Sequence, residues 1–292
     1  KIGIKLDILE KSIVKLVGQE FNLNSSQQLA EILFDKLNLP MIKKRSTAEA
    51  ILTKLKEYHE LPSLILGYRK LFKLKNTYLD PIPNHINEIT NRVHSSFNQT
   101  MTATGRLSTS SPNFQNIPIR TQDGKEVRKA IKAQFDDYKI LSADYSQIEL
   151  RVMAHLSKDE ALTKALNDGE DIHTFTAKNV FNVKEDQDVL PEMRRIAKIV
   201  NFGIMYGAGP FRLSQELGIP FSEAKKIIDV YFHKYKGIKQ YMEDTKLLVK
   251  KNKSVQTLLG RKRAVWDSDS QNQVRRDAAE RMAINMPIQG TA

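Results

Sequence analysis

The sequence predicts a mainly helical α+β protein, and three features of the chain carry this prediction. Apolar residues recur with helical spacing over roughly the first eighty residues. The same periodicity returns at Ser146 and continues to the end. Between these stretches, residues 78–120 are rich in Pro, Asn, Ser and Thr, a composition typical of turns and short extended pieces. We therefore expect a helical arm, a small mixed centre and a long helical second half.

Composition excludes several classes of protein. The 292 residues carry 46 Lys and Arg against 34 Asp and Glu, a formal charge of +12, and 40% of them are hydrophobic. That hydrophobic fraction is sufficient for a core and excludes general disorder. Because cysteine is absent, disulfide scaffolds, thiol nucleophiles and thiolate zinc sites are excluded. We see no leader and no long apolar run, so we expect an intracellular protein without a membrane partner. The charge favours a polyanionic partner.

In the helical arm, the positive charge is concentrated. Residues 36–75 contain ten Lys or Arg and three Glu, and Pro40 and Pro62 separate the helical stretches. A solvated helix face is the ordinary explanation of such a charge run. Because these charges gather on one helical hairpin, we favour contact with phosphates.

The mixed centre closes with a candidate metal ligand. Residues 139–143 have the pattern of a short buried strand, which ends at Asp144. A carboxylate at the end of a strand lies at the edge of a sheet, where a hard cation can reach it. Ser146 and Glu149 then have the spacing of a capping box, which predicts a helix that starts at Ser146. Capping alone is the alternative role for Glu149.

A stripe of charged and aromatic residues follows, with members spaced by four: Arg194, Lys198, Phe202 and Tyr206. On a helix, this spacing places them along one side. Two cations followed by two rings suit a phosphate chain and then a base. The alternative is an amphipathic helix whose rings enter the core, although such a helix seldom mixes charges and rings on one side.

Two further segments are rich in hydrogen-bond donors. Arg281, Asn285 and Gln289 repeat the four-residue spacing near the end of the chain, although Pro287 disturbs the last step. The other segment lies in the mixed centre and contributes four candidates: Arg106, Gln115, Asn116 and Arg120.

Together and in this order, these segments resemble the conserved blocks of family A DNA polymerases. The matching blocks are TATGRLS, PNFQNIPIR, SADYSQIELRVMAHLS, DIHTFTA, RRIAKIVNFGIMYG and ERMAINMPIQGTA. The similarity also covers the arm, from FNLNSSQQLAEILFDKL to YRKLFKLKNTYLD. It implies a right-hand polymerase fold, with a thumb at 1–85, the first part of the palm at 86–151, fingers at 152–275 and a palm helix at 276–292.

The resemblance implies a template-directed DNA polymerase. Its partners would be primer–template DNA and deoxynucleoside triphosphates, and its cofactor would be Mg²⁺ in a two-metal site. Asp144 matches the palm carboxylate that binds both metal ions, and Tyr145 would add its backbone carbonyl. Glu149 matches the steric gate that excludes a ribose 2′-hydroxyl. We also expect a monomer in the bacterial cytoplasm, associated with the nucleoid, with an organelle as the alternative.

The resemblance also implies how the nucleotide is held. Arg194 and Lys198 match the residues that bind the triphosphate, and Lys198 matches the residue proposed to protonate the leaving pyrophosphate. His173 matches a triphosphate-contacting histidine, with an ordinary core histidine as the alternative. Phe202 and Tyr206 match the sugar-facing and template-facing rings.

For the DNA, the resemblance implies contacts in the minor groove at the primer terminus. Arg106 and Gln289 match residues that make these contacts. All base pairs present acceptors there, so donors can check the geometry of a pair without reading its sequence. The neighbouring positions of the same region are Arg281, Asn285, Gln115, Asn116 and Arg120.

One element of the family pattern is missing from the sequence. The family carries a second palm carboxylate in a His-Asp-Glu turn, and no His-Asp-Glu occurs in the 292 residues. We therefore expect this chain alone to bind primer–template and to extend it poorly or not at all. The alternatives are a DNA-binding module without catalysis and a single-subunit RNA polymerase, in which a Glu gate would not be expected. A P-loop NTPase is excluded because its motif is absent.

Overall fold

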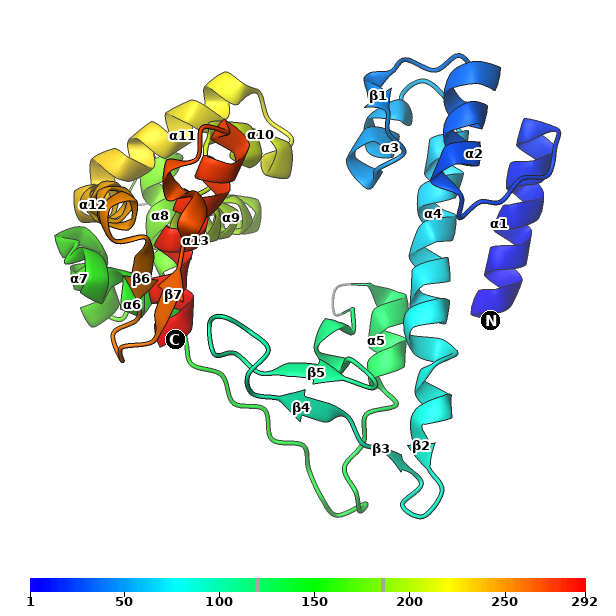
Figure 1. Ribbon diagram of the computed structural model, residues 1–292, viewed down its shortest axis with the longest axis horizontal. Coiled ribbons are helices and arrows are strands. Elements are labelled where there is room, and N and C mark those ends of the chain that lie inside the picture. The colour runs from blue at the N-terminus through cyan, green and yellow to red at the C-terminus, as the bar shows by residue number, and fades with distance from the viewer. Residues whose placement is uncertain (119–120, 185–186) are drawn as a thin grey trace. The chain divides into compact units, whose positions relative to one another are not determined.

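The computed structural model describes residues 1–118, 121–184 and 187–292 (Figure 1). The chain forms two compact units. Unit 1 comprises Lys1–Asn98 and Ser108–Ile140, and unit 2 comprises Gln99–Leu107 and Leu141–Ala292. Helices dominate both units, and the paired strands of the described residues form two-stranded antiparallel sheets. This confirms the predicted mainly helical α+β class.

Unit 1 is built around two long helices that pack along each other, α1 (Ile2–Val17) and α4 (Leu61–Leu74) (Figure 1). Helix α1 ends at Gly18, whose left-handed conformation lets its N–H bond the Val14 carbonyl. Apolar side chains from both helices and from the shorter elements share one core. The shorter elements are α2 (Ser26–Ala30), η1 (Glu31–Lys36), β1 (Ile42–Arg45) and α3 (Glu49–Leu55).

The remainder of unit 1 consists of turns and short pairs of strands, as its composition predicts. Strand β2 pairs with β3, and β4 pairs with β5 so that Phe97 faces Thr109. The Tyr78 hydroxyl donates to the Asn116 carbonyl and ties two of these turns together. The elements are η2 (Lys75–Leu79), η3 (Ile82–His85), β2 (Ile86–Asn87), β3 (Arg92–Val93), β4 (Ser96–Asn98), β5 (Ser108–Ser110), η4 (Phe114–Asn116) and α5 (Gln122–Arg128).

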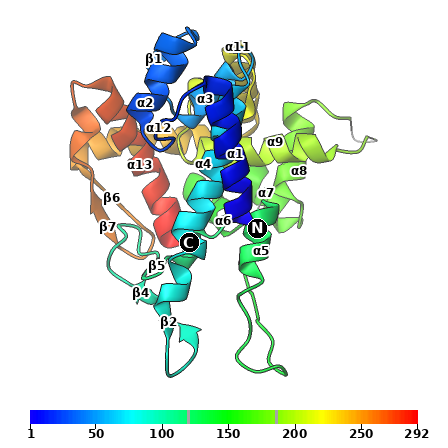
Figure 2. The ribbon, with the colours of Figure 1, turned by 90° about the vertical axis from the view of Figure 1, so that its right-hand side faces the viewer.

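Unit 2 is a group of helices around a second and larger apolar core. The helices break at the glycines that the sequence indicates, for example at Gly218, where φ is 69°. Strands β6 and β7 form a hairpin beside the C-terminal half of α13, where the Leu258 N–H donates to the Thr291 hydroxyl (Figures 1 and 2). The elements are α6 (Ile148–Ser157), α7 (Glu160–Asn167), α8 (Ile172–Val180), α9 (Pro191–Met205), α10 (Pro210–Leu217), α11 (Phe221–Lys234), α12 (Lys236–Asn252), β6 (Ser254–Gln256), β7 (Lys262–Ala264), η5 (Trp266–Asp269) and α13 (Gln273–Thr291).

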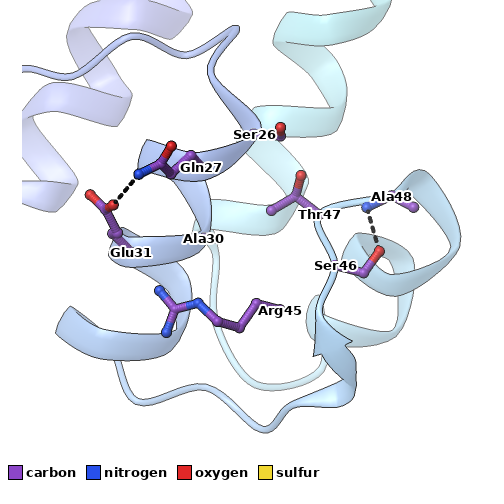
Figure 3. Close-up of a pocket in the computed structure, with 8 residues that line it drawn as sticks. All are labelled: Ser26, Gln27, Ala30, Glu31, Arg45, Ser46, Thr47 and Ala48. Carbon is purple, nitrogen blue, oxygen red and sulfur yellow. Dashed lines mark hydrogen bonds between the residues drawn. The ribbon is translucent and has the colours of Figure 1, made fainter.

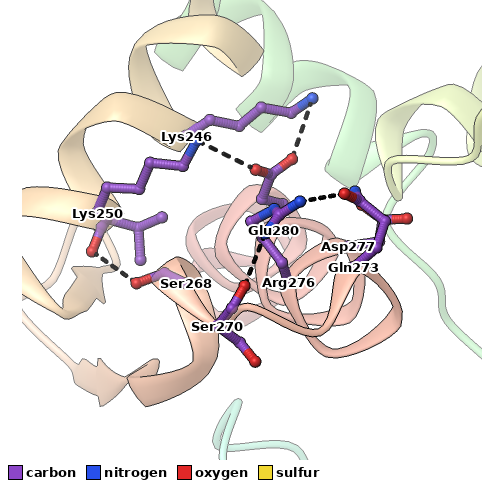
Figure 4. A network of polar contacts seen from close by, with 9 residues as sticks. Lys246, Lys250, Ser268, Ser270, Gln273, Arg276, Asp277 and Glu280 are labelled. Carbon is purple, nitrogen blue, oxygen red and sulfur yellow. Dashed lines mark hydrogen bonds and ion pairs between the residues drawn. The ribbon is translucent and has the colours of Figure 1, made fainter.

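Polar contacts hold α13 against α12 (Figure 4). The Glu280 carboxylate receives the ammonium groups of Lys246 and Lys250 at 3.4 and 3.6 Å. At the start of α13, the Arg276 guanidinium donates to the Ser270 carbonyl at 2.7 Å. These contacts anchor the N-terminal half of α13. The candidate DNA-binding residues Arg281, Asn285 and Gln289 follow directly after it.

The predicted buried strand at residues 139–143 is wrong. This stretch is irregular, and Ile140 and Leu141 are 60% and 91% exposed. A strand needs a neighbour to pair its backbone groups, and none of the described strands runs beside this segment. Asp144 therefore lies on exposed, irregular chain rather than at a sheet edge.

The predicted helix start is also wrong. Helix α6 begins at Ile148, and its N-cap residue Gln147 has φ 55° and makes no side-chain cap. No capping box forms between Ser146 and Glu149, because the Glu149 carboxylate bonds two side chains elsewhere in unit 2.

Among residues 1–118, 121–184 and 187–292, we find no helix that is both long enough and apolar enough to span a membrane.

Candidate active site

Helix α9 presents the predicted stripe. Arg194 and Lys198 are exposed, whereas Phe202 and Tyr206 are half-buried and pack against the core of unit 2. The centroids of the two rings are 6.1 Å apart. The core therefore anchors the rings, as the amphipathic-helix alternative predicts, while the cations remain in solvent. Binding of a phosphate chain by these cations stays a prediction.

Arg194 is held by a carboxylate at the start of α8. The Asp171 Oδ1 caps α8 by accepting the Thr174 N–H at 2.7 Å, and its Oδ2 accepts from the Arg194 guanidinium at 2.5 Å. Burial opposes the charge on Asp171, but the hydrogen bonds from Arg194 and Thr174 outweigh it and lower the pKa to about 2. The guanidinium thus has a fixed anchor on α8 and still exposes nearly half of its side chain.

His173 is the second residue of α8 and is only 5% exposed. The centroid of its ring is 5.6 Å from that of Phe202. Burial lowers the pKa of His173; Asp171 opposes this shift, whereas Arg194 and Lys198 add to it. The imidazole is therefore neutral at pH 7 and can donate one hydrogen bond without carrying a charge.

Lys198 differs from Arg194 on the same stripe in having no partner for its charge among the described residues. Among the described residues, its ammonium group has neither an ion pair nor a hydrogen bond. It is exposed and lies one helical turn from Arg194 and from Phe202. An unpaired cation between a held guanidinium and an aromatic ring is suited to an incoming anion.

Glu149 joins two distant segments of unit 2. Its Oε1 accepts from the Arg106 guanidinium at 2.6 Å, and its Oε2 accepts from the Tyr206 hydroxyl. The Glu149 side chain is only 11% exposed. Burial and the adjacent carboxylate raise the pKa of Tyr206, so the phenol stays protonated and continues to donate. The carboxylate is thereby fixed beside the aromatic end of the stripe.

Helix α13 presents unused polar groups next to this network. Gly207 follows Tyr206 with φ 74°, and a Cβ at Gly207 would lie 2.9 Å from the Arg281 Cγ, so the two backbones are close. Within the described part of the chain, the side chains of Arg281, Asn285 and Gln289 form no hydrogen bond. The Asn285 Oδ1 is buried without a partner. Pro287 does not interrupt the helix.

Of the other predicted DNA-binding residues, Gln115 and Asn116 lie in unit 1. The Gln115 Oε1 accepts the Thr109 N–H at 3.2 Å, so this amide helps to hold the turn after β5. Asn116 uses its carbonyl to accept from Tyr78. Arg120 lies outside the described residues. The predicted set is thus divided between the two units.

Unit 1 also has a hollow of about 570 Å³ beside the basic arm (Figure 3). Its lining comes from the segment with α2 and η1 and from the end of β1 with the turn into α3. Arg45 lines it and is paired with Asp35 at 2.5 Å. The adjacent Lys43 and Lys44 on β1 are exposed and, within the described ranges, unpaired.

The residues at Asp144 fit a divalent ion as one part of its ligand shell. Asp144 and Tyr145 are exposed, and Asp144 has no ion pair or hydrogen bond within the described residues. Those residues contain no group of three or more His, Asp or Glu placed to hold a metal. Mg²⁺ is commonly bound by one or two carboxylates together with phosphates and water, so a free carboxylate here is a suitable ligand.

Sequence reasoning missed several residues that shape the site. Asp171 was detectable, because an Asp three residues before Thr174 at a helix start is an N-cap pattern. Asn201, Thr176 and Tyr235 form buried side-chain hydrogen bonds around His173. No local pattern identifies them, because their partners lie on different helices.

The family model described as DNA polymerase family A matches residues 1–292. DNA polymerase I, thermostable, of Thermus aquaticus is 49% identical over 97% of this chain and 35% of its own length. DNA polymerase I of Pseudomonas aeruginosa is 48% identical over 100% of this chain and 32% of its own length. The chain thus spans about a third of the length of these curated relatives.

A solved structure agrees with these matches. The POL domain of Pol1 from M. smegmatis, in complex with DNA primer-template and dNTP, has a TM-score of 0.90 and 38% identity. The match covers 99% of this chain and 52% of that one. This chain belongs to DNA polymerase family A.

Proposed function

We propose that this chain provides the nucleotide site and part of the DNA grip of a template-directed DNA polymerase, which adds deoxynucleotides to a primer 3′ end. The observation that carries the proposal is the α9 stripe, in which Lys198, unpaired among the described residues, lies between a held Arg194 and anchored rings. Family membership supports the same function. The division into thumb, palm and fingers at 1–85, 86–151 with 276–292, and 152–275 is part of this proposal.

The cationic end of the stripe would bind the triphosphate. Arg194 supplies a fixed guanidinium, because it donates a hydrogen bond to the Asp171 carboxylate. His173 supplies a neutral donor. Lys198 supplies a mobile charge, and it is the group in the stripe that can transfer a proton to the leaving pyrophosphate, since a guanidinium keeps its proton.

The aromatic end would bind the sugar and the base. Phe202 offers an apolar ring to the sugar, and Tyr206 stands where the templating base would stack. Glu149 receives two hydrogen bonds and cannot move away easily, so it forms a rigid wall. We propose that this wall excludes a ribose 2′-hydroxyl.

Asp144 and the Tyr145 carbonyl would hold Mg²⁺. When bound, the metal would lower the pKa of the primer 3′-hydroxyl and neutralise charge on the leaving pyrophosphate. Asp144 is exposed and has no partner in the part of the chain that the structure describes, so its oxygens are available to a ligand, which supports this role.

The flank of α13 and Arg106 would face the minor groove of the primer–template. The side chains of Arg281, Asn285 and Gln289 form no hydrogen bond among the described residues, so their donors are available to the acceptors that every base pair presents. The basic arm of unit 1, including Lys43 and Lys44, would contact phosphates without reading sequence.

The Lys198→Ala variant of the full-length protein tests the proposal by steady-state primer extension. We expect kcat to fall on the order of 10²- to 10³-fold, the usual cost of losing a general acid and a charge in the site. Primer–template affinity should stay the same. Lys226→Ala, on the exposed face of α11, is the matched control and should extend normally. Normal kcat in Lys198→Ala would contradict the proposal, whereas a wild-type protein that binds primer–template without extension would indicate a DNA-binding module.

A further inference from the structure

We propose that Asn201 is a positioning residue that sets the tautomer of His173, so that the imidazole presents Nε2–H to the triphosphate. The inference rests on the proposed function for its last step alone. The tautomer itself follows from hydrogen bonds inside unit 2.

The relevant contacts form one continuous chain of side chains. The Tyr235 hydroxyl is 3.0 Å from the Thr176 Oγ1, which is 3.0 Å from the Asn201 Oδ1. The Asn201 Nδ2 is 3.0 Å from the His173 Nδ1. The chain links α8, α9 and the junction between α11 and α12. All four residues are at most 5% exposed, so water does not compete for these bonds.

Burial selects the direction of donation. If Tyr235 donates to Thr176, Thr176 donates to the Asn201 Oδ1 and the amide Nδ2 donates to His173, then both hydroxyl protons have acceptors. If the amide is reversed, Asn201 donates to Thr176. Either the Thr176 or the Tyr235 proton is then left without an acceptor among the described residues. A buried donor without an acceptor is costly, so the first direction is favoured.

The favoured direction makes the His173 Nδ1 an acceptor. The ring is neutral, because its burial and the cations Arg194 and Lys198 outweigh the opposing charge of Asp171. A neutral imidazole carries one proton, which must therefore be on Nε2. In the reverse tautomer Nε2 would present a lone pair, which repels a phosphate oxygen. The Asn201 amide thus sets whether the His173 Nε2 carries a proton that it can donate to an anion.

The direct test is the tautomer of His173, measured by long-range ¹H–¹⁵N NMR on the histidine-labelled full-length protein without nucleotide. His173→Gln identifies the signal. The wild type should show the Nε2–H tautomer at neutral pH. In Asn201→Asp, the carboxylate can accept but cannot donate, so Nδ1 should become protonated. An Nδ1–H tautomer in the wild type, or an Nε2–H tautomer that is unchanged in Asn201→Asp, would overturn the proposal.

Two hydroxyl deletions keep the test valid if Asn201→Asp fails to fold. Thr176→Val removes the donor that orients the Asn201 amide, so a mixture of His173 tautomers is expected. Tyr235→Phe is the matched control: it removes the other hydroxyl, but Thr176 still needs Asn201 as its acceptor, so Nε2–H should persist. If Thr176→Val and Tyr235→Phe give the same tautomer population, the proposed direction of donation is wrong.

Kinetics separate this inference from the proposed function. Asn201→Asp should raise the KM for deoxynucleotide several-fold with little change in primer–template affinity, and it should add nothing in a His173→Gln background. The same Asn→Asp change at Asn179 on α8 should leave the KM unaltered. If the NMR result holds but the two substitutions act additively, Asn201 does not act on nucleotide through His173, although the general polymerase assignment, tested at Lys198, stands.

Discussion

Two carboxylates five residues apart, Asp144 and Glu149, lie in opposite surroundings. Asp144 stands on exposed, irregular chain with no partner among the described residues. Glu149 lies in the first turn of α6, is largely buried and receives hydrogen bonds from Arg106 and Tyr206. A carboxylate whose oxygens are satisfied acts through its shape and position, whereas one with free oxygens acts as a ligand. The same contrast separates Arg194, which is held by Asp171, from the unpaired Lys198.

The largest effect is expected at the free carboxylate. Asp144→Asn in the full-length protein should lower kcat for primer extension by on the order of 10³-fold or more, because the ligand for the metal is lost. Its melting temperature should not change, since Asp144 forms no hydrogen bond or ion pair with any described residue. Asp137→Asn is a control with another exposed acid. A large fall in the melting temperature of Asp144→Asn would mean that the residue is structural.

At the held carboxylate, we expect a loss of both stability and selectivity. Glu149→Ala leaves the half-buried Tyr206 hydroxyl without its acceptor, which should cost about 1–3 kcal/mol in the free energy of unfolding. Ribonucleotide incorporation relative to deoxynucleotide should rise on the order of tenfold or more as the wall is removed. Urea unfolding and paired incorporation assays measure the two effects. Glu149→Gln keeps the volume, so unchanged selectivity in Glu149→Gln with loss in Glu149→Ala would assign the gate to shape.

Phe202 lies at the aromatic end of the stripe, where we propose that its ring faces the sugar of the nucleotide. If Phe202 faces the sugar as proposed, Phe202→Tyr adds a hydroxyl that can replace the missing 3′-hydroxyl of a dideoxynucleotide. We expect dideoxynucleotide incorporation to rise on the order of tenfold or more. The measurement is a termination ladder at a fixed ratio of dideoxynucleotide to deoxynucleotide. Phe232→Tyr, on α11, is the matched control, and an unchanged ladder in Phe202→Tyr would reject the role of Phe202.

The smallest effect is expected at the ion pair that holds Arg194. Asp171→Asn keeps an N-cap for α8 but removes the charge. Because both side chains are at least a third exposed, the loss should be at most about 1 kcal/mol at pH 7. The pKa of Asp171 is lowered from 3.8 to about 2, so its contribution is complete above about pH 5 and is lost as the pH falls through about 2. Urea unfolding of both proteins at several pH values measures it; a difference that stays constant through this window would contradict the prediction.

Local patterns predicted much of the molecule. The α9 stripe, the α13 flank and the helix ends near Gly207 and Gly218 were predicted because they depend on spacing and backbone conformation within a few residues. The strand that the sequence predicts at residues 139–143 does not form, because an apolar run is compatible with a strand but only a paired neighbour makes one. The capping role of Glu149 failed for a similar reason, since side chains remote in sequence compete for its oxygens.

By itself, the sequence determined which residues share a helix face, where the charge lies and to which family the chain is similar, because these follow from residue types at short spacing. The tertiary structure decided which of those residues are free and which are held. Glu149 bonds Arg106 43 residues before it and Tyr206 57 residues after it, and Asn201 bonds His173 28 residues before it. Such contacts arise only when helices pack, and a side chain's hydrogen-bond partners then set whether it binds a ligand, forms a wall or orients another group.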